Sequence, residues 1–186
     1  MPEPRACAPV QVVDYDPEWP RIFHRLKDRI WPSVRDVAAA IEHVGSTSVP
    51  GMAAKPVIDV DIIIAARTGL PLLIERLGTL GYKHRGNLGI EDRDAFMTPE
   101  GQPSHHLYVC VANSLALQNH IAVRDYLRAH PSAAEAYSAL KQQLAERFPI
   151  ERERYNGGKT EFILSILEQC GFSAAGLDAI KHANQA

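Results

Sequence analysis

The sequence predicts an α+β fold, in which a small mixed β-sheet has flanking helices and a C-terminal helical layer. Three observations favour this class. Residues 57–65 form an apolar, β-branched run typical of a strand. Apolar residues at helical spacing precede this run between residues 19 and 30, and the pattern from residue 114 onward is helical. We therefore expect an α/β core over residues 1–113 and a helical segment over residues 114–186, packed together as one unit.

The first predicted helix begins at Asp16, Pro17 and Glu18. Aspartate can cap a helix, proline fixes φ, and an acid suits the first turn. Pro32 is expected to end or kink this helix, with a shorter helix running to about residue 38. The next elements expected along the chain are a strand over residues 40–44, a turn over 45–48, one helical turn over 52–55 and the strand over 57–65.

The second half of the chain is predicted to be mostly helical. A helix over residues 70–80 is expected to end at Gly81. Two or three short strands are expected over residues 82–113, the clearest of them over 105–112. The remaining elements expected are helices over residues 115–129, 131–148 and 159–169, and from residue 171 either a loose tail or a short last helix.

Composition excludes several classes of protein. The chain has 186 residues, with 20 Lys and Arg against 22 Asp and Glu, so its net charge is −2. Hydrophobic residues make up 46% of it, which excludes an intrinsically disordered chain. No basic stripe or run of stacking aromatics is present, which argues against nucleic acid as a partner.

The sequence favours a cytoplasmic protein with no membrane partner. Its longest apolar stretch is interrupted by Asp59 and Asp61 and is too short to cross a bilayer. The N-terminus lacks the apolar centre of a signal peptide. No CxxC pair is present, and neither a disulfide framework nor a zinc site is indicated. The three cysteines are far apart: Cys7, Cys110 and Cys170.

Two carboxylates lie inside the clearest predicted strand. Side chains alternate along a strand, so Asp59, Asp61 and Ile63 share one face. Neighbouring carboxylates on so apolar a strand repel each other and lose hydration, so a positive group should compensate them. Lysine, arginine or a divalent cation would serve, and Mg²⁺ prefers such oxygen ligands. The alternative is an edge strand whose wet face carries two solvated acids.

A glycine–serine turn precedes this strand. Gly45 and Ser46 follow the strand over residues 40–44, and twelve residues separate Ser46 from Asp59. Such a turn can present backbone N–H groups and a hydroxyl to phosphate oxygens. A Gly-Ser turn followed by a strand bearing Asp-x-Asp resembles the nucleotidyltransferase superfamily of the polymerase-β type. The resemblance implies that Gly45, Ser46 and Thr47 bind the triphosphate, while Asp59 and Asp61 hold Mg²⁺ or Mn²⁺.

The sequence resembles one family more closely, the GrpB family. The resemblance covers roughly residues 10–170 and implies a nucleotidyltransferase-like fold. It implies little about the substrate, although fusion of some relatives to dephospho-CoA kinase suggests a nucleotide or coenzyme A. The stretches that carry it are DYDPEW (14–19), IEHVGSTSVPGMAAKPVIDVD (41–61), HHLYV (105–109), RDYLRAHP (124–131), YSALK (137–141) and YNGGKTEFI (155–163).

Four further residues are candidates for binding phosphate. The resemblance implies that Lys55, between the turn and the acids, neutralises phosphate charge; an ordinary surface lysine is the alternative. Lys159 and Tyr155 lie where a helical appendage often contacts the triphosphate in this superfamily. Arg124 could bind phosphate bidentately or form an internal salt bridge. The string Gly-Lys-Thr at Lys159 is not a P-loop, because Glu153 stands where that motif needs glycine.

One departure from the superfamily pattern concerns the third carboxylate, which usually lies on a later strand. The candidate strand over residues 105–112 contains no Asp or Glu. On it, His106 and Tyr108 occupy the face opposite the leucine and valines. His106 could ligate metal or act as a base, or it could simply be a polar residue on a wet face. Three acids are an alternative source of the missing carboxylate, unless they are a solvated cluster: Glu91, Asp92 and Asp94.

The sequence therefore predicts a metal-dependent nucleotidyltransferase. It would bind a nucleoside triphosphate with Mg²⁺ and transfer the nucleoside monophosphate to a small-molecule or protein acceptor. Asp59 and Asp61 would ligate the metal, with His106 as the candidate base. Two alternatives stay open: a non-catalytic regulatory module that binds a nucleotide or coenzyme A, and a metal-dependent phosphohydrolase.

Overall fold

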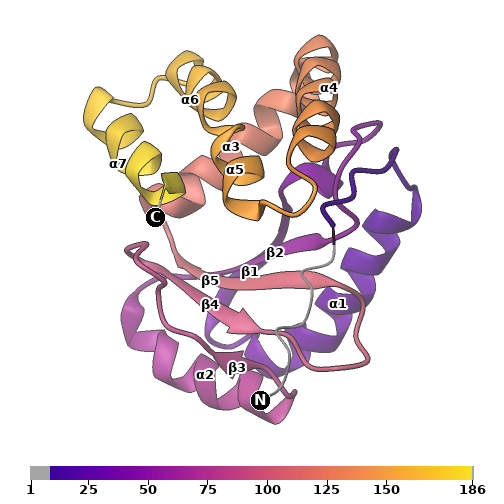
Figure 1. Cartoon of the computed structure of the whole chain (residues 1–186). Coiled ribbons are helices and arrows are strands. Elements are labelled where there is room, and N and C mark those ends of the chain that lie inside the picture. Colours follow the sequence, from indigo (N-terminus) through magenta and orange to yellow (C-terminus); the bar gives the residue numbers. More distant parts are fainter. Residues whose placement is uncertain (1–8, 186) are drawn as a thin grey trace, which may run out of the picture.

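A computed structural model gives the architecture, and it describes residues 9–185. A mixed sheet lies between two helical layers, with α1 and α2 on one side and α3 to α7 on the other (Figure 1). The predicted α+β class is confirmed, including the C-terminal helical layer.

The sheet has the spatial order β1-β2-β5-β4-β3. β2 and β5 pair in parallel, and the other neighbouring strands pair antiparallel. β2 therefore lies between β1 and β5. Within the described residues the strands are β1 (Ala38–Val44), β2 (Ile58–Ile64), β3 (Lys83–His84), β4 (Arg93–Met97) and β5 (His105–Val111).

The helices agree with the predicted order except for α5, which was not predicted, and the end of the chain forms the short last helix that was one of the two expected outcomes. They are α1 (Glu18–Val34), α2 (Leu70–Thr79), α3 (Leu115–Ala129), α4 (Pro131–Arg147), α5 (Arg152–Gly157), α6 (Thr160–Gln169) and α7 (Ala174–Gln185). Short 3-10 turns occupy Ser46–Ser48 and Arg67–Gly69.

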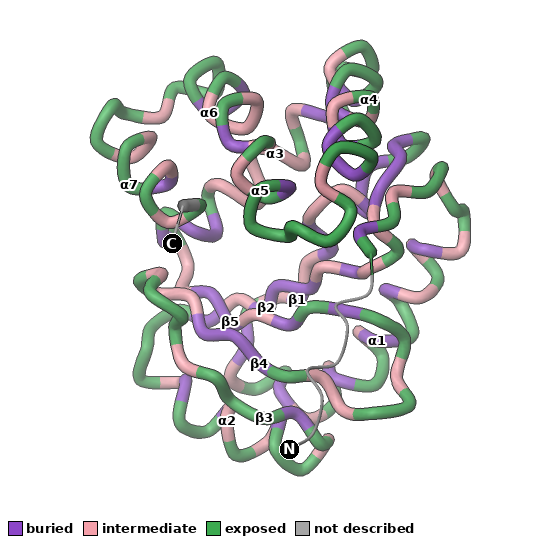
Figure 2. Tube along the Cα trace, in the orientation of Figure 1, coloured by how far each residue is buried: buried purple, intermediate pink, exposed green. Residues whose placement is uncertain are grey.

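The larger core lies between the sheet and the layer of α1 and α2. Alternate residues of β2 enter it, and they pack with helix residues such as Leu26, Ile30 and Leu73. Figure 2 shows the central strands largely buried. Because side chains alternate along a strand, Asp59 and Asp61 face the opposite layer. The β2 residues of the core are Ile58, Val60, Ile62 and Ile64.

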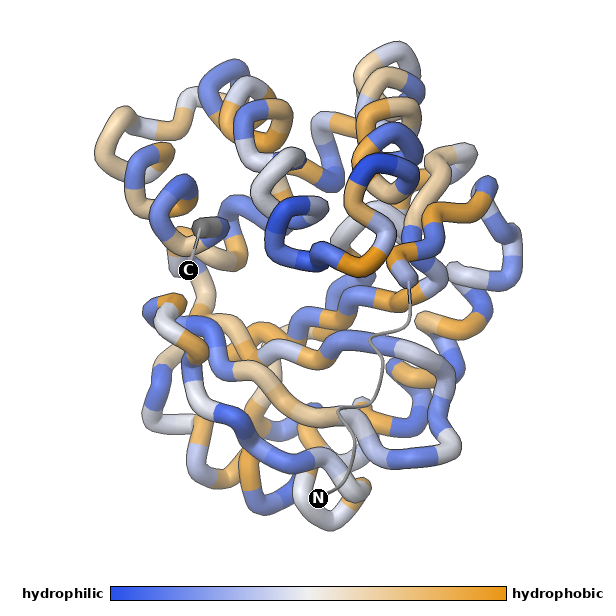
Figure 3. Tube along the Cα trace, viewed as in Figure 1, coloured by the Kyte–Doolittle hydropathy of each residue, from blue (hydrophilic) through white to orange (hydrophobic). Residues whose placement is uncertain are grey.

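A second core joins the turn after β1 to the C-terminal helices. Val49 and Met52 pack against Leu127 of α3, Tyr137 of α4 and Ile166 of α6. The helical layer is thereby held over the face of the sheet that carries the acids. The run of charged residues over 151–154, at the start of α5, is strongly hydrophilic and exposed (Figure 3).

Two local predictions were wrong. α1 continues through Pro32 to Val34 instead of ending there, and β1 starts at Ala38. Ile30 and Val34 are fully buried, so burial of this last turn offsets the backbone hydrogen bond that proline cannot make. The helical turn considered for residues 52–55 is absent there, because Ala54 pairs with Val13 in an isolated β-bridge.

Among the described residues, none of the helices is both long and apolar enough to cross a membrane.

Replacing Ile62 with alanine should destabilise the fold by about 2–5 kcal/mol, because the side chain is 0% exposed and truncation leaves a cavity. The matched control is Ile150→Ala, whose side chain is 66% exposed and whose loss should stay within about 0.5 kcal/mol. Denaturant unfolding of both variants measures this. Equal losses would contradict the placement of β2 at the centre of the core.

Candidate functional site

The turn after β1 has a backbone that only glycine adopts freely. Gly45 has φ +68° and ψ −173°, in a region where other residues are strained. The Ser48 hydroxyl donates to the Gly45 carbonyl oxygen at 2.6 Å and closes the turn. Thr47 is buried, and its hydroxyl donates to the Val57 carbonyl oxygen at 3.3 Å. Thr47 therefore stabilises the turn from its buried side. That Thr47 binds phosphate stays a prediction.

The turn and the first carboxylate are in direct contact. A Cβ atom placed on Gly45 would lie 2.1 Å from Asp59 Oδ2. The glycine is therefore required for two reasons, its backbone conformation and the space that the carboxylate occupies. The structure brings together the two parts of the motif as the sequence predicts.

The first carboxylate lies beside His106. The parallel register of β2 and β5 pairs Asp59 with His106, and His106 Nδ1 donates to Asp59 Oδ1 at 2.8 Å. The His106 side chain is half exposed. His106 is thus next to the predicted metal ligand, where it can exchange protons with solvent or a ligand.

The second carboxylate is buried and has a partner that sequence reasoning missed. Asp61 is 0% exposed, and its Oδ2 accepts a hydrogen bond of 2.7 Å from Nδ1 of His120 on α3. Burial lowers the pKa of His120, but the Asp61 carboxylate outweighs burial and raises the pKa overall. Asp61 Oδ1 has no hydrogen-bond partner within residues 9–185. A local signal for His120 existed, since it follows the buried Leu117 by three residues on α3.

Three lysines form a cluster near the turn: Lys55, Lys141 and Lys159. The Lys55 and Lys159 amines lie 5.3 Å and 4.6 Å from the centre of the Tyr155 ring, in cation–π geometry. Lys141 of α4 donates to Ser46 Oγ at 2.9 Å and to the Ala53 carbonyl oxygen. In the part of the chain that the structure describes, none of these amines forms an ion pair with a carboxylate. The cluster therefore carries positive charge that a bound anion would balance.

Burial weakens the proton affinity of these lysines. It is the largest cause that lowers the pKa of Lys141, to about 7, and the neighbouring Lys159 lowers it further. Burial also lowers the pKa of Lys159 to about 8, with Lys55 adding to the effect. The Asp59 carboxylate acts in the opposite direction on all three amines. An incoming anion would act in that same direction.

Lys141 was missed by sequence reasoning, although a local signal was present. It lies between Tyr137 and Leu144 on the apolar side of α4, and all three are buried. A lysine at a core position of a helix is rarely retained without a partner.

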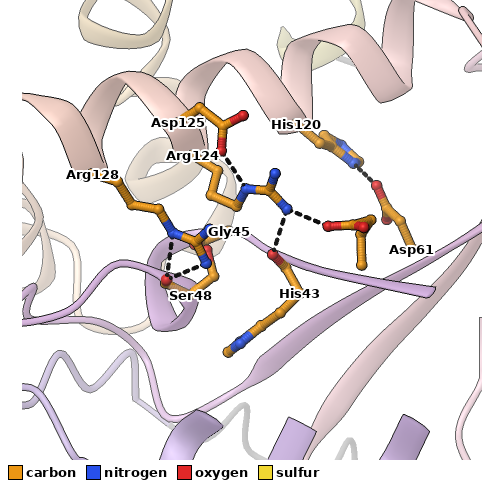
Figure 4. A network of polar contacts seen from close by, with 9 residues as sticks. His43, Gly45, Ser48, Asp61, His120, Arg124, Asp125 and Arg128 are labelled. Carbon is orange, nitrogen blue, oxygen red and sulfur yellow. Dashed lines mark hydrogen bonds and ion pairs between the residues drawn. The ribbon is translucent and has the colours of Figure 1, made fainter. Parts of the chain in front are cut away.

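Two arginines of α3 bind β1 and the turn (Figure 4). Arg124 Nη1 donates to Glu42 Oε2 at 2.7 Å and to the His43 carbonyl oxygen at 3.2 Å. Arg128 donates through Nε and Nη2 to the Ser48 carbonyl oxygen. Arg124 thus forms the internal salt bridge that was its alternative, and its contact with phosphate stays a prediction.

The missing third carboxylate does not come from Asp94. Asp94 lies on β4 opposite Val109, with its side chain on the core side, where it pairs with His84 and Arg67. The carboxylate that the sheet places beside Asp61 is instead Glu42, its antiparallel partner on β1. Sequence reasoning missed Glu42 because pairing between the strands had not been assigned.

Asp59 and Asp61 fit a hard divalent cation. They offer carboxylate oxygens on one face of β2, and one buried oxygen of Asp61 lacks a hydrogen-bond partner among the described residues. Glu42 stands beside them but is engaged by Arg124.

A cavity of about 770 Å³ adjoins the turn and lies between α1, β1 and the helical layer. Its lining includes His43, Ser48, Arg124 and Arg128. This volume is in the range of small-molecule sites.

Replacing Gly45 with alanine should destabilise the protein more than replacing Gly51. Gly51 also has positive φ, at +78°, but a Cβ placed on it would have no described atom within 4 Å beyond its own chain neighbours. Gly51→Ala should cost about 1–2 kcal/mol in backbone strain alone. Gly45→Ala should cost roughly 1–3 kcal/mol more, because Asp59 must also move. Denaturant unfolding of both variants tests this, and equal losses would contradict the contact between the turn and Asp59.

Comparisons with known proteins identify the family of the chain. The model of the family described as GrpB protein matches residues 9–169. The UPF0157 protein YqkA of Bacillus subtilis (strain 168) is 36% identical over 159 residues, which are 86% of this chain. The chain spans 46% of that relative's length, about half of it.

Two solved structures show which known folds this chain resembles. The crystal structure of conserved protein GrpB from Enterococcus faecalis has a TM-score of 0.76 at 30% identity, covering 92% of this chain and 98% of that one. The Cid1 poly(U) polymerase bound to MgGTP has a TM-score of 0.52 at 14% identity, covering 73% and 45%. The second likeness shows a nucleotidyltransferase-like fold and nothing of activity. The resemblance seen in the sequence is confirmed: the chain belongs to the GrpB family.

Proposed function

We propose that the chain binds a nucleoside triphosphate with Mg²⁺ or Mn²⁺ and transfers its nucleoside monophosphate to a small-molecule or protein acceptor. The observation that carries this proposal is the convergence of a lysine cluster and two strand carboxylates at one turn. Lys141 binds Ser46 of the turn, Asp59 touches Gly45, and the Asp59 carboxylate lies near enough to act on Lys55, Lys141 and Lys159.

The lysines would bind the phosphate groups. Lys141 already binds Ser46 Oγ, so a phosphate at the turn would meet both an ammonium group and a hydroxyl. Gly45 lets the backbone approach the ligand closely. Lys55 and Lys159, aligned on the Tyr155 ring, would complete the neutralisation of the polyphosphate.

Asp59 and Asp61 would hold the metal. When bound, Mg²⁺ would orient the phosphate oxygens and stabilise the negative charge that develops on them. His106 is the candidate base, because its Nδ1 is engaged by Asp59 and Nε2 is then the nitrogen that would accept a proton.

One observation favours a second candidate, a module that binds a nucleotide or coenzyme A without chemistry. β5 carries no carboxylate, and Glu42, which could replace one, is bound to Arg124. Two carboxylates and a histidine can still bind a metal–nucleotide pair, but with fewer ligands to fix it for reaction.

Asp59→Asn should abolish stabilisation by a nucleoside triphosphate with Mg²⁺. In the wild type, a ligand at 100 times its Kd adds about 2.7 kcal/mol, which is a shift of roughly 5–10 °C in Tm for a chain of this size. Thermal unfolding with a panel of triphosphates and coenzyme A, with and without Mg²⁺, measures this. Asp28→Asn, an exposed acid of α1, is the control that should keep the full shift.

Transfer is tested separately with an α-phosphate label. Incorporation into an acceptor supports the transferase, and binding without incorporation supports the binding module. Release of phosphate without any acceptor would mean a phosphohydrolase. A well-folded wild type that shows no Mg²⁺-dependent shift with any triphosphate would overturn the nucleotide site itself.

Lys141→Met should reduce the rise of stability with pH between about 7 and 10, and the lowered pKa values of Lys159 and Lys55 should maintain the rest of that rise. The pKa of Lys141 is lowered to about 7 in the fold, so the unfolded chain binds more protons in this window and wild-type stability rises with pH. Each pKa unit corresponds to about 1.4 kcal/mol, so the expected rise is a few kcal/mol. Unfolding free energies at several pH values measure it.

The control for this prediction is Lys83→Met, an exposed lysine of β3 that should leave the pH dependence unchanged. Triphosphate binding should weaken in Lys141→Met only. An unchanged pH dependence in that variant would show that Lys141 is not buried in the free protein.

A further inference from the structure

We propose that Asp61, Cys110 and His120 form a binding site for a transition-metal ion of the zinc type, which shares only Asp61 with the magnesium position proposed at Asp59 and Asp61. One ligand atom from each of the three lies within 4.8 Å of the others. This site goes beyond the proposed function, because it requires no nucleotide.

The sheet register brings the first two ligands together. β2 and β5 run parallel, with Asp61 paired to Tyr108 and Ile63 paired to Cys110. Residues two apart share a face, so Asp61 and Cys110 both point toward the helical layer. α3 crosses that face and supplies His120, whose Nδ1 already contacts Asp61 at 2.7 Å.

The donor set suits zinc better than magnesium. Thiolate and imidazole ligands select zinc-type ions, whereas Mg²⁺ prefers oxygen ligands throughout. Zinc bonds to S, N and O are about 2.0–2.3 Å long, so two donors on one ion lie within roughly 4.6 Å of each other. Small side-chain adjustments from the present arrangement satisfy this limit.

An unpartnered atom points to a missing ligand here. Asp61 and Cys110 are both 0% exposed, and Asp61 Oδ1 has no hydrogen-bond partner in the described part of the chain. A buried carboxylate oxygen without a partner is costly, and a cation would satisfy it. The competing arrangement is a plain hydrogen bond from the Cys110 thiol to this carboxylate, with no metal.

One of the three ligands, His120, lines a cavity. A cavity of about 290 Å³ lies between α3, α7 and the segment before β4, and its lining includes His120, Arg93 and Ile180. Three protein ligands leave a fourth position of a tetrahedral ion open. Water in this cavity could fill that position.

No zinc motif appears in the sequence because the ligands come from three separate elements. The familiar motifs place two ligands within a few residues of each other. Here the nearest pair, Cys110 and His120, is ten residues apart and joins a strand to a helix.

The test is titration of the nucleotide-free full-length chain with Co²⁺, which reports a thiolate ligand through a charge-transfer absorption band. We expect one Co²⁺ per chain with this band, and displacement of the Co²⁺ by Zn²⁺. Cys110→Ser should abolish the band, whereas Cys170→Ser, at an exposed cysteine, should retain it. His120→Gln should weaken binding by about 100-fold or more, beyond the loss typical for a residue that only supports a ligand.

Asp59→Asn separates this proposal from the nucleotide site. That variant should lose the Mg²⁺-dependent nucleotide shift but keep the cobalt band, since Asp59 is outside the three ligands. A wild type that folds but shows no stoichiometric thiolate band would overturn the site. Retention of the band in Cys110→Ser would do the same, and His120→Gln serves if the cysteine variant does not fold.

Discussion

The arrangement of the molecule depends on a single buried charge, the carboxylate of Asp61. β2 must place its apolar face on α1 and α2, and the alternation of a strand then drives Asp61 into the opposite interface. A buried carboxylate is tolerated only beside a positive partner, because it has lost its hydration. His120 is that partner, so α3 must cross the sheet at the position where His120 contacts Asp61. The arginines of α3 fix the same helix further along, on β1 and the turn.

The turn after β1 follows from the same constraint. With α3 held over the sheet, α4 follows it and carries Lys141 to the turn, where the ammonium meets Ser46. Gly45 has no side chain, so Asp59 of the sheet can approach the turn closely. Lys55 and Lys159 lie on the Tyr155 ring of the helical layer. The site therefore has a carboxylate side, made by the sheet, and an ammonium side, made by Lys141 of α4, Lys159 before α6 and Lys55 in the segment before β2. Among the described residues, the two sides do not pair with each other at contact distance, which is the condition for binding an anion together with a cation.

The sequence predicted the parts of this site that are local in the chain. The alternation of β2, the Gly-Ser turn, and the shared face of His106 and Tyr108 on β5 all depend on residues close together. His120, Lys141 and Glu42 could not be assigned in the same way, because their roles depend on strand pairing and on how α3 and α4 pack. The first two were visible only as polar residues at core positions of helices. The prediction that the helix ends at Pro32 was wrong for a related reason, because burial of Val34 outweighed the local preference of proline to end the helix.

The polarity of the site also constrains how a triphosphate could lie in it. On the proposed function, the outer phosphates belong at Lys55, Lys141 and Lys159, because no described carboxylate forms an ion pair with these amines. Asp59 and Asp61 of β2 would hold the metal. The α-phosphate is then the group nearest to β2 and to His106 on β5. An attacking acceptor must reach it from a direction that the helical layer leaves open. The half-exposed His106 marks one such direction, since it combines access from solvent with contact to the metal-binding carboxylate.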